Sequence, residues 1–330
     1  MFNNKGDWRV AVVVPAYRVK EHILQVLGAM PDIVTHIFVV DDACPEKSGE
    51  FVAKNISDAR VSVIYLDNNQ GVGGAVMAGY AAAMAIDVDV IVKVDGDGQM
   101  DPSLIPAFVT PILQGEADYT KGNRFNDLEA VKGMPLARII GNAGLSFLNK
   151  LSSGYWNIFD PTNGYTAIHP AVCKKLPLNK ISCRYFFESD MLFRLNTLHA
   201  VVVDIPMEAK YATEKSNLKI SKVIVEFFVK HNINFIKRVF YNYFLRDLSL
   251  ASIQLLFGLM LMIFGVSYGG YHWYTSAQLH MPTPAGTVMV AAMPVLVGLQ
   301  FILSFIGYDI ASVPKRPLHR SYVQKKLLGN

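Results

Sequence analysis

The chain has 330 residues, of which 52% are hydrophobic and only 18% are charged, and its net charge is +4. Soluble domains average about 45–50% apolar and about 25% charged residues, so this composition excludes a single water-soluble globule. It also excludes a disordered chain and a collagen-like fibre. The basic residues form no stripe of the kind that binds nucleic acid, so we expect no such partner. The length leaves room for one soluble domain of about 200–250 residues beside a membrane part.

Short apolar runs alternate with helical stretches through the first third of the chain. The apolar runs are 10–14, 37–40, 61–66 and 88–94, and the helical stretches that follow them are 20–30, 47–56, 72–85 and 104–114. This alternation predicts an α/β fold with a doubly wound, mostly parallel sheet. Because ligands bind beyond the carboxyl ends of such strands, we expect the polar loops there to converge on one edge. These loops are 15–17, 41–42, 68–71 and 95–99.

The loop after the fourth strand reads Val-Asp-Gly-Asp-Gly-Gln. It places the carboxylates of Asp95 and Asp97 and the amide of Gln99 on one tight turn. Oxygen ligands of this kind suit Mg²⁺ or Mn²⁺, ions that keep several waters and share the phosphates of a substrate. An EF-hand would need glycine where Met100 stands and glutamate where Pro106 stands. The plainer alternative is that the two acids only solvate a turn.

The glycine-rich loop Gly71–Gly74 follows the third strand. It lacks the spacing of a dinucleotide-binding loop, because Val76 stands where the third glycine would be. We therefore predict that these glycines permit a close approach of two backbone segments and a tight start of a helix.

Two long stretches near the C-terminus, 248–274 and 285–308, contain no formal charge. Each exceeds the roughly 20 residues that cross a bilayer core of about 30 Å, so we predict two transmembrane helices; a pair of buried core helices is the alternative. Basic residues flank both ends of the pair, which predicts a multi-pass protein of the inner membrane with both termini cytoplasmic. These residues are Lys237, Arg238 and Arg246 before the pair, and Lys315, Arg316, Arg320, Lys325 and Lys326 after it.

The segment 220–245 mixes basic residues with large apolar ones at a helical period. It predicts an amphipathic helix in the headgroup layer, or else an ordinary helix packed on the soluble domain. The predicted organisation is an α/β domain in 1–215, interfacial helices in 216–247, a transmembrane hairpin in 248–312 and a basic cytoplasmic tail in 313–330.

Seven motifs, followed by the two apolar stretches, occur in order along nearly the whole chain. The motifs are Val12–Tyr17, Val39–Cys44, Asn68–Tyr80, Val94–Pro102, Lys121–Phe125, Asp160–Tyr165 and Phe186–Arg194. With them the chain resembles the family 2 glycosyltransferases of the GT-A fold, and among these the polyprenyl-phosphate sugar transferases related to dolichyl-phosphate mannose synthase and their membrane-anchored bacterial relatives. The resemblance implies metal-dependent transfer of a sugar, with inversion, from a UDP- or GDP-linked donor to a polyprenyl phosphate such as undecaprenyl phosphate.

The resemblance also implies roles for single residues, position by position. Pro15, Tyr17, Asp41 and Asp42 would hold the nucleoside of the donor, Asp95 its diphosphate, and Asp95, Asp97 and Gln99 the Mg²⁺ or Mn²⁺ ion. Arg124 and Arg138 would bind the acceptor phosphate, Asp160 would act at the reacting centre together with Asp97 and Arg124, and Glu188 and Asp190 would line the sugar pocket.

The charges of the two substrates explain why these residue types are needed. Both substrates are anionic, so a metal ion and forked arginine contacts would have to neutralise them. A phosphate monoester has its second pKa near 6, so the acceptor needs no strong base. Plainer roles stay open: Arg124 and Arg138 as exposed arginines, Asp160 as a turn former, and Glu188 and Asp190 as acids at a helix start.

The chain departs from the family pattern at three places. Arg18 and Val19 replace a common Asn-Glu, which leaves the base of the donor open between UDP and GDP, and Val72 replaces a common lysine. Thr166 stands where an arginine often occurs, so one expected cation is missing.

Three other readings remain open. A processive polysaccharide synthase would need more spans and a Gln-x-x-Arg-Trp motif, which the chain lacks. A membrane-tethered sensor of nucleotide-sugars would bind a donor without turnover, and a two-span structural anchor would bind none. For the sugar transferase itself, assembly into a homo-oligomer is left open.

Overall fold

The computed structural model describes residues 8–125, 136–208 and 220–320. The chain forms two compact units: Met1–Phe235 together with Pro314–Asn330, and Ile236–Val313. The division predicted at residues 215, 247 and 312 stays a prediction.

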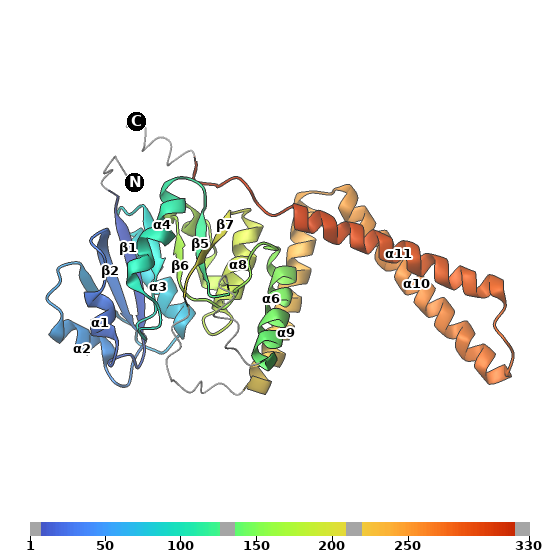
Figure 1. Cartoon of the computed structure of the whole chain (residues 1–330), viewed down its shortest axis with the longest axis horizontal. Coiled ribbons are helices and arrows are strands. Elements are labelled where there is room, and N and C mark those ends of the chain that lie inside the picture. The colour runs from blue at the N-terminus through green and yellow to red at the C-terminus, as the bar shows by residue number, and fades with distance from the viewer. Residues whose placement is uncertain (1–7, 126–135, 209–219, 321–330) are drawn as a thin grey trace. The chain divides into compact units, whose positions relative to one another are not determined.

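Seven strands form one sheet in the described part of the first unit, in the order β3-β2-β1-β4-β6-β5-β7 (Figure 1). The strands are β1 (Val10–Ala16), β2 (Val34–Asp41), β3 (Val61–Tyr65), β4 (Val90–Lys93), β5 (Tyr119–Asn123), β6 (Thr166–Ile168) and β7 (Val202–Pro206). Neighbouring strands run parallel except β6, which is antiparallel to both β4 and β5. The predicted doubly wound, mostly parallel sheet is confirmed.

Helices cover both faces of this sheet. The described helices up to residue 208 are α1 (Ile23–Gly28), α2 (Ser48–Asn55), α3 (Val72–Met84), α4 (Ile105–Leu113), α6 (Leu136–Ser153), α7 (Pro170–Cys173) and α8 (Phe187–Thr197), with short 3-10 turns η1 (Pro102–Leu104) and η2 (Leu178–Lys180). Val12 of β1 shares one core with apolar residues of α1, α2 and α4. Val13 points to the other face, where Gly79 of α3 leaves room for it. Both faces are buried, which explains why β1 reads as an unbroken apolar run.

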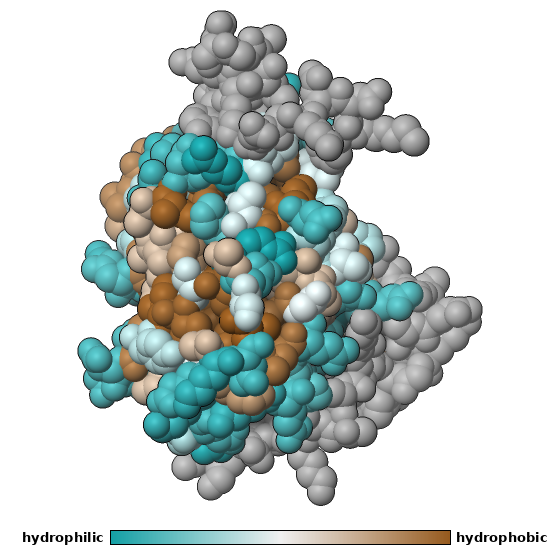
Figure 2. All heavy atoms as spheres, turned by 90° about the vertical axis from the view of Figure 1, so that its left-hand side faces the viewer, coloured by the Kyte–Doolittle hydropathy of each residue, from teal (hydrophilic) through white to brown (hydrophobic). Residues whose placement is uncertain are grey.

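The sheet ends at β3, whose five residues are only half-buried or exposed. On the side of the molecule that carries α1, α2 and β2, apolar surface gathers in the middle and hydrophilic surface surrounds it (Figure 2). An edge strand of this length offers few free backbone groups for pairing with another chain.

The second unit contains two helices that, among the described residues, are long and apolar enough to cross a membrane. They are α10 (Leu250–Leu279) and α11 (Ala285–Ala311), with mean hydropathies of 2.1 and 2.2 in their most apolar windows. Only 22% and 11% of those windows are buried, so they are not core helices of this chain. The two helices pack through glycines: a Cβ on Gly258 or Gly298 would lie about 3 Å from the backbone of the opposite helix.

A buried ion pair joins the ends of the helices in the second unit. Arg238, in the last turns of α9 (Ile220–Phe240), donates from Nη2 to Oδ2 of Asp309 in α11 at 2.9 Å. The hydroxyl of Tyr243, in the π-helical segment η3 (Tyr241–Arg246), donates to Oδ1 of the same carboxylate. A charge in an apolar helix is costly unless it is paired, and here it fixes α11 to the helix that precedes the hairpin.

Helix α9 has two different faces. Nδ1 of His231 and the hydroxyl of Ser152 in α6 share a hydrogen bond of 2.7 Å, and α6 and α9 lie side by side (Figure 1). The other face exposes large apolar side chains, including Phe228, and α6 likewise exposes Ile140 and Phe147. The helix predicted in 220–245 therefore packs on the soluble domain and also presents an apolar surface.

The chain returns to the first unit after α11. The carboxylate of Asp118 at the start of β5 accepts hydrogen bonds from the backbone N–H groups of Leu318 and His319. It also contacts Nδ1 of His319 at 2.6 Å, and this ring stacks on His169 with centroids 4.0 Å apart. Burial alone would raise the pKa of Asp118, but the hydrogen bonds from His319, Val201 and Leu318 hold it below its ordinary value.

Candidate active site

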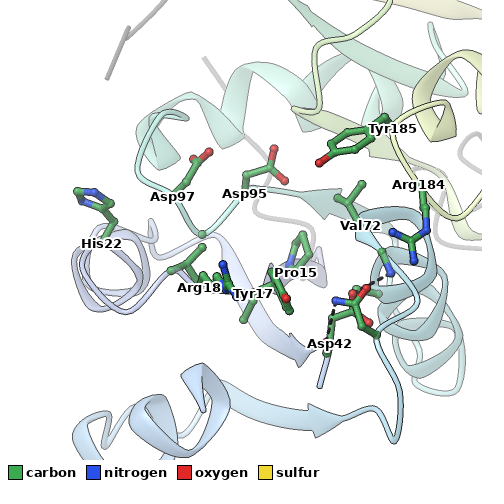
Figure 3. A pocket seen from close by; sticks show the side chains of 16 residues that line it. Pro15, Tyr17, Arg18, His22, Asp42, Val72, Asp95, Asp97, Arg184 and Tyr185 are labelled. Atoms are coloured by element: carbon green, nitrogen blue, oxygen red, sulfur yellow. Dashed lines mark hydrogen bonds between the residues drawn. The ribbon is translucent and has the colours of Figure 1, made fainter. Parts of the chain in front are cut away.

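A cavity of about 430 Å³ opens at the carboxyl ends of β1, β2 and β4. Parallel strands end at the same edge of a sheet, so the loops that follow them share this cavity. Figure 3 shows Asp95 and Asp97 coming from the loop after β4, and Arg184 and Tyr185 entering from another part of the chain. The lining residues are Pro15, Ala16, Tyr17, Arg18, Val19, His22, Asp42, Asn69, Gly71, Val72, Ala75, Asp95, Gly96, Asp97, Arg184 and Tyr185.

Backbone N–H groups hold the two acids after β2. Asp42 lines the cavity, and its carboxylate accepts from the loop 70–71 at 2.7 and 2.8 Å. Asp41 is buried, does not line the cavity, and accepts from the N–H groups of Cys44 at 2.7 Å and Gly49 at 2.6 Å. Both carboxylates therefore shape loops around the cavity, and of the two only Asp42 borders the space that a ligand could fill.

The glycine-rich loop packs directly on the segment before α8. The N–H of Gly73 donates to the carbonyl of Cys183 at 2.8 Å, and a Cβ on Gly71 would lie 2.6 Å from the same oxygen. The predicted close approach of two backbones is thus confirmed, and Gly71 also adopts a φ of +85° that favours glycine. The contact carries Arg184 and Tyr185 into the cavity.

Asp95 and Asp97 border the cavity on the side of β4. The turn is fixed because Oδ1 of Asp97 accepts from the N–H of Gln99 at 3.0 Å, whereas Gln99 itself is not among the lining residues. Among the described residues, no group of three or more His, Cys, Asp or Glu side chains could hold a metal. Two carboxylates on an open cavity fit a Mg²⁺-like ion that takes its remaining ligands from water and phosphate.

A buried lysine lies beside these acids. Lys93 ends β4, its side chain is 1% exposed, and its Nζ lies 2.8 Å from Oδ1 of Asp95 and 3.6 Å from Oε1 of Glu188. Burial alone would lower the pKa of Lys93, but the negative charges of Asp95 and Glu188 outweigh it and raise the pKa above its ordinary value. The ammonium is therefore charged at neutral pH.

A second buried lysine lies two strands away at the same register. In β6, Thr166 pairs with Lys93 of β4 on one side and with Lys121 of β5 on the other, so the three side chains share one face of the sheet. Lys121 donates from Nζ to the carbonyl of Asn163. Burial lowers its pKa to about 8, although Glu188 and other acids oppose that shift.

Arg124 and Asp160 form a forked ion pair beyond the end of β5. Nε of Arg124 lies 2.8 Å from Oδ2 of Asp160, and Nη2 lies 3.0 Å from Oδ1. Asp160 is buried, whereas about a third of the Arg124 side chain is exposed. Arg138 lies in the first turn of α6, and its side chain falls outside the described residues.

Glu188 and Asp190 both lie in the first turn of α8, yet they have different surroundings. Glu188 faces the buried Lys93, as described above. The carboxylate of Asp190 accepts from the N–H of Ser182 at 2.9 Å, from Nδ2 of Asn234 in α9 at 3.1 Å, and from Nε of Arg194 at 3.1 Å. The two acids therefore have different partners. Glu188 contacts the buried lysine, whereas Asp190 joins α8, α9 and the segment before α8.

The structure brings some of the predicted site residues into one cavity and leaves others outside it. Pro15, Tyr17, Asp42, Asp95 and Asp97 line the cavity. Gln99, Arg124, Asp160, Glu188 and Asp190 lie outside its lining, as Asp41 does.

Sequence reasoning missed the buried Lys93 and Lys121, which lie outside the lining of the cavity, and Arg184 and Tyr185, which belong to that lining. A lysine in the apolar run Val90–Val94 is a signal that could have revealed the first, because a charge in a buried strand needs a partner. No comparable signal marks Arg184 and Tyr185. Their position depends on the backbone hydrogen bond from Gly73 to the neighbouring Cys183, which no side-chain pattern reveals.

Comparison with known proteins places the chain in a family. Residues 11–176, half of its length, match the Glycosyl transferase family 2, and the chain belongs to this family. It is therefore a glycosyltransferase, as the sequence motifs predict.

Similar proteins include enzymes that act on lipid phosphates by name. The UDP-N-acetylglucosamine–dolichyl-phosphate N-acetylglucosaminyltransferase of Methanococcus voltae is 26% identical over 246 residues, which cover 70% of this chain and 97% of that protein. The undecaprenyl-phosphate mannosyltransferase of Micrococcus luteus is 29% identical over 203 residues, which cover 60% of this chain and 82% of that protein.

Among solved structures, the glucosyl-3-phosphoglycerate synthase of Mycobacterium tuberculosis, crystallised with Mg²⁺ and UDP, is similar in fold. Its TM-score is 0.53 at 16% sequence identity, and the match covers 70% of this chain and 79% of that one. This likeness confirms the predicted GT-A fold.

Proposed function

We propose that this glycosyltransferase transfers a sugar from a nucleoside diphosphate sugar to a polyprenyl phosphate. The observation that carries the proposal is the opening of Asp95 and Asp97 into a cavity at the carboxyl ends of the parallel strands, in a chain that also bears two long apolar helices. The names of the Methanococcus and Micrococcus relatives support a lipid-phosphate acceptor.

The donor would occupy the cavity with its nucleoside near Pro15, Tyr17 and Asp42 and its diphosphate near Asp95 and Asp97. The exposed Tyr17 ring offers a face for stacking, and Arg18 and Arg184 add positive charge to the lining. A divalent ion bound by Asp95 and Asp97 would neutralise the departing diphosphate. UDP and GDP are both compatible with these side chains.

The acceptor phosphate would bind at the Arg124 side. Its anionic oxygen attacks the anomeric carbon, the bond from that carbon to the diphosphate oxygen breaks, and the electron pair leaves with the diphosphate, which inverts the anomeric centre. The carboxylate of Asp160 accepts two parallel hydrogen bonds from the guanidinium of Arg124, and two oxygens of a phosphate can accept the same pair. The acceptor phosphate would therefore replace Asp160 as the partner of Arg124. Before the acceptor arrives, Asp160 holds Arg124 in place, and after the exchange its carboxylate is released to orient the acceptor.

The membrane part would keep the polyprenyl chain in hydrocarbon while its phosphate stays at the headgroup layer. We propose that α10 and α11 span the inner membrane with both ends cytoplasmic, and that the apolar faces of α6 and α9 lie in the headgroup layer.

Activity with defined substrates tests this proposal. Purified protein would be incubated with undecaprenyl phosphate, Mn²⁺ and a panel of UDP- and GDP-sugars, and a single-sugar glycolipid would be sought by mass spectrometry. We expect one donor to give product, and Asp97→Ala to lower turnover at least 100-fold because the metal loses a ligand. The matched control is Asp87→Ala, since the side chain of Asp87 is 81% exposed and forms only a surface pair.

Three outcomes would contradict the proposal in different ways. Long glycan products would indicate a processive synthase. Equal turnover by Asp97→Ala and wild type would remove the metal site from the reaction. Donor binding without turnover would favour a sensor.

A further inference from the structure

Lys93 is the last residue of β4, directly under the acids of the cavity. Its ammonium touches Asp95 on one side and faces Glu188 of α8 on the other. It does not line the cavity, and its side chain is 1% exposed, so it does not reach a ligand there. Lys93 can therefore act on a ligand only through its charge and through the positions of the two acids that it contacts.

The surrounding backbone leaves space for this unit. A Cβ on Gly164 would collide with Nζ of Lys93 and would lie 2.9 Å from Oδ2 of Asp95 and 3.2 Å from Cε of Met100. Glycine at this position lets the turn before β6 close over the ion pair. Because Oδ1 of Asp95 is held by Lys93, the other oxygen of that carboxylate keeps a fixed direction.

We propose that Lys93 is a positioning residue that holds Asp95 and Glu188 in place and sets a fixed positive charge beneath the diphosphate end of the cavity. The inference rests on the proposed function, because it takes a nucleoside diphosphate and a divalent ion as the ligands. One buried positive charge strengthens binding of an anion and weakens binding of a cation, and low exposure protects both effects from screening. Lys93 thereby keeps Asp95, Asp97 and Glu188 from making the cavity too negative for a diphosphate.

The test measures the two ligands separately on the full chain in detergent. In Lys93→Met, we expect UDP in the absence of metal to bind about tenfold more weakly and Mn²⁺ in the absence of nucleotide to bind severalfold more tightly. Calorimetry gives both affinities, and GDP replaces UDP if wild type prefers it. A purely structural lysine would weaken both ligands together, so the opposite signs report the charge.

Two further variants keep the test sharp. Lys93→Arg retains the charge and should keep both affinities near wild type. In Glu188→Gln, the charge of Lys93 is less compensated, so UDP should bind more tightly and Mn²⁺ more weakly. This mirror-image result is available even if Lys93→Met does not fold. Lys54→Met is the control, because it removes a lysine whose side chain is 76% exposed and whose charge is therefore screened by solvent.

The outcomes separate the two proposals. If wild type binds neither nucleotide nor Mn²⁺, the proposed function fails. If wild type binds both and a folded Lys93→Met loses both affinities, or keeps both, the role of Lys93 is overturned. The same holds if Glu188→Gln changes neither affinity, or if Lys54→Met gives the same opposite signs as Lys93→Met.

Discussion

Asp204 lies in β7 close to Asp160, and the two carboxylates repel each other. Oδ2 of Asp204 accepts from Nδ2 of Asn123 at 3.0 Å and from the N–H of Phe159 at 3.2 Å. Burial, followed by the charge of Asp160, raises the pKa of Asp204 to about 6, although Lys121 opposes the shift. The charged form is therefore disfavoured in the folded protein.

This raised pKa predicts how stability depends on pH. The folded pKa lies above the ordinary value of an aspartate, so the stability that Asp204 contributes is present below about pH 4 and is lost as pH rises through about 6. Asp204→Asn cannot ionise and should raise the melting temperature at pH 8 by about 2–4 °C, which corresponds to roughly 1 kcal/mol. At pH 4.5 the difference should nearly vanish.

Thermal unfolding of the two proteins at both pH values measures the effect. Asp87→Asn is the control, because Asp87 is exposed and should shift neither curve. A melting temperature difference that is the same at pH 4.5 and pH 8 would contradict the raised pKa.

Single residues differ in how far the sequence predicts them. Asp95 and Asp97 follow the end of a buried strand, and the parallel topology alone brings them to the edge where the cavity lies. The partner of Lys93 is a different matter, because Glu188 is 95 positions away and reaches the lysine only through the packing of α8. No local pattern in either segment specifies that contact.

At the scale of elements, Asp190 connects the apolar-faced helix α9 to the wall of the cavity. Asn234 of α9 donates to one oxygen of Asp190, and the other oxygen accepts from the N–H of Ser182. Two residues further along, Arg184 and Tyr185 line the cavity. A shift of α9 would therefore move the carboxylate of Asp190, and with it the segment that lines the cavity proposed for the donor.

This connection predicts that a change in α9 weakens binding of the donor nucleotide. Asn234→Ala removes one hydrogen bond from Asp190 and leaves the segment 182–185 less firmly held, so UDP or GDP should bind about three- to tenfold more weakly in calorimetry. Asn232→Ala is the matched control, because Nδ2 of Asn232 bonds only to the carbonyl of Phe228 in its own helix and is exposed. Equal affinities in both variants would contradict the connection.

The elements themselves follow closely from the pattern of apolar runs. The four predicted strands and the helices between them form, and so do the two apolar helices. The three-residue strand β6 was beyond prediction because it is short and antiparallel and has no alternating pattern. It matters for the site, since its insertion between β4 and β5 places Lys93 and Lys121 on either side of Thr166.

At the scale of the whole chain, the segment after α11 is attached to the first unit. Asp118 and His319 are 201 positions apart, and both are fully or nearly fully buried. Both ring nitrogens of His319 face acceptors, Oδ1 of Asp118 at 2.6 Å and the carbonyl of Ile112 at 2.9 Å. Composition suggests only a basic tail here, because a contact over such a separation leaves no trace in local sequence.

The attachment predicts resistance of this segment to proteolysis. Lys315 and Arg320 are exposed and are sites for trypsin, but the backbone between them is held by the carboxylate of Asp118. A protease must bind its substrate in extended form, so cleavage there requires local release of the segment. In His319→Ala, the segment loses its buried ring and one partner of Asp118, and cleavage should be at least tenfold faster. Fragment masses followed over time by mass spectrometry measure the rate.

The control for this experiment is His280→Ala, because His280 is exposed in the connector between α10 and α11 and contacts only its own turn. Its cleavage rate after Lys315 and Arg320 should equal that of wild type. Faster cleavage in His319→Ala alone would show that the contacts between Asp118 and His319 hold the segment after α11 on the first unit. Equal rates in all three proteins would mean that other contacts hold this segment.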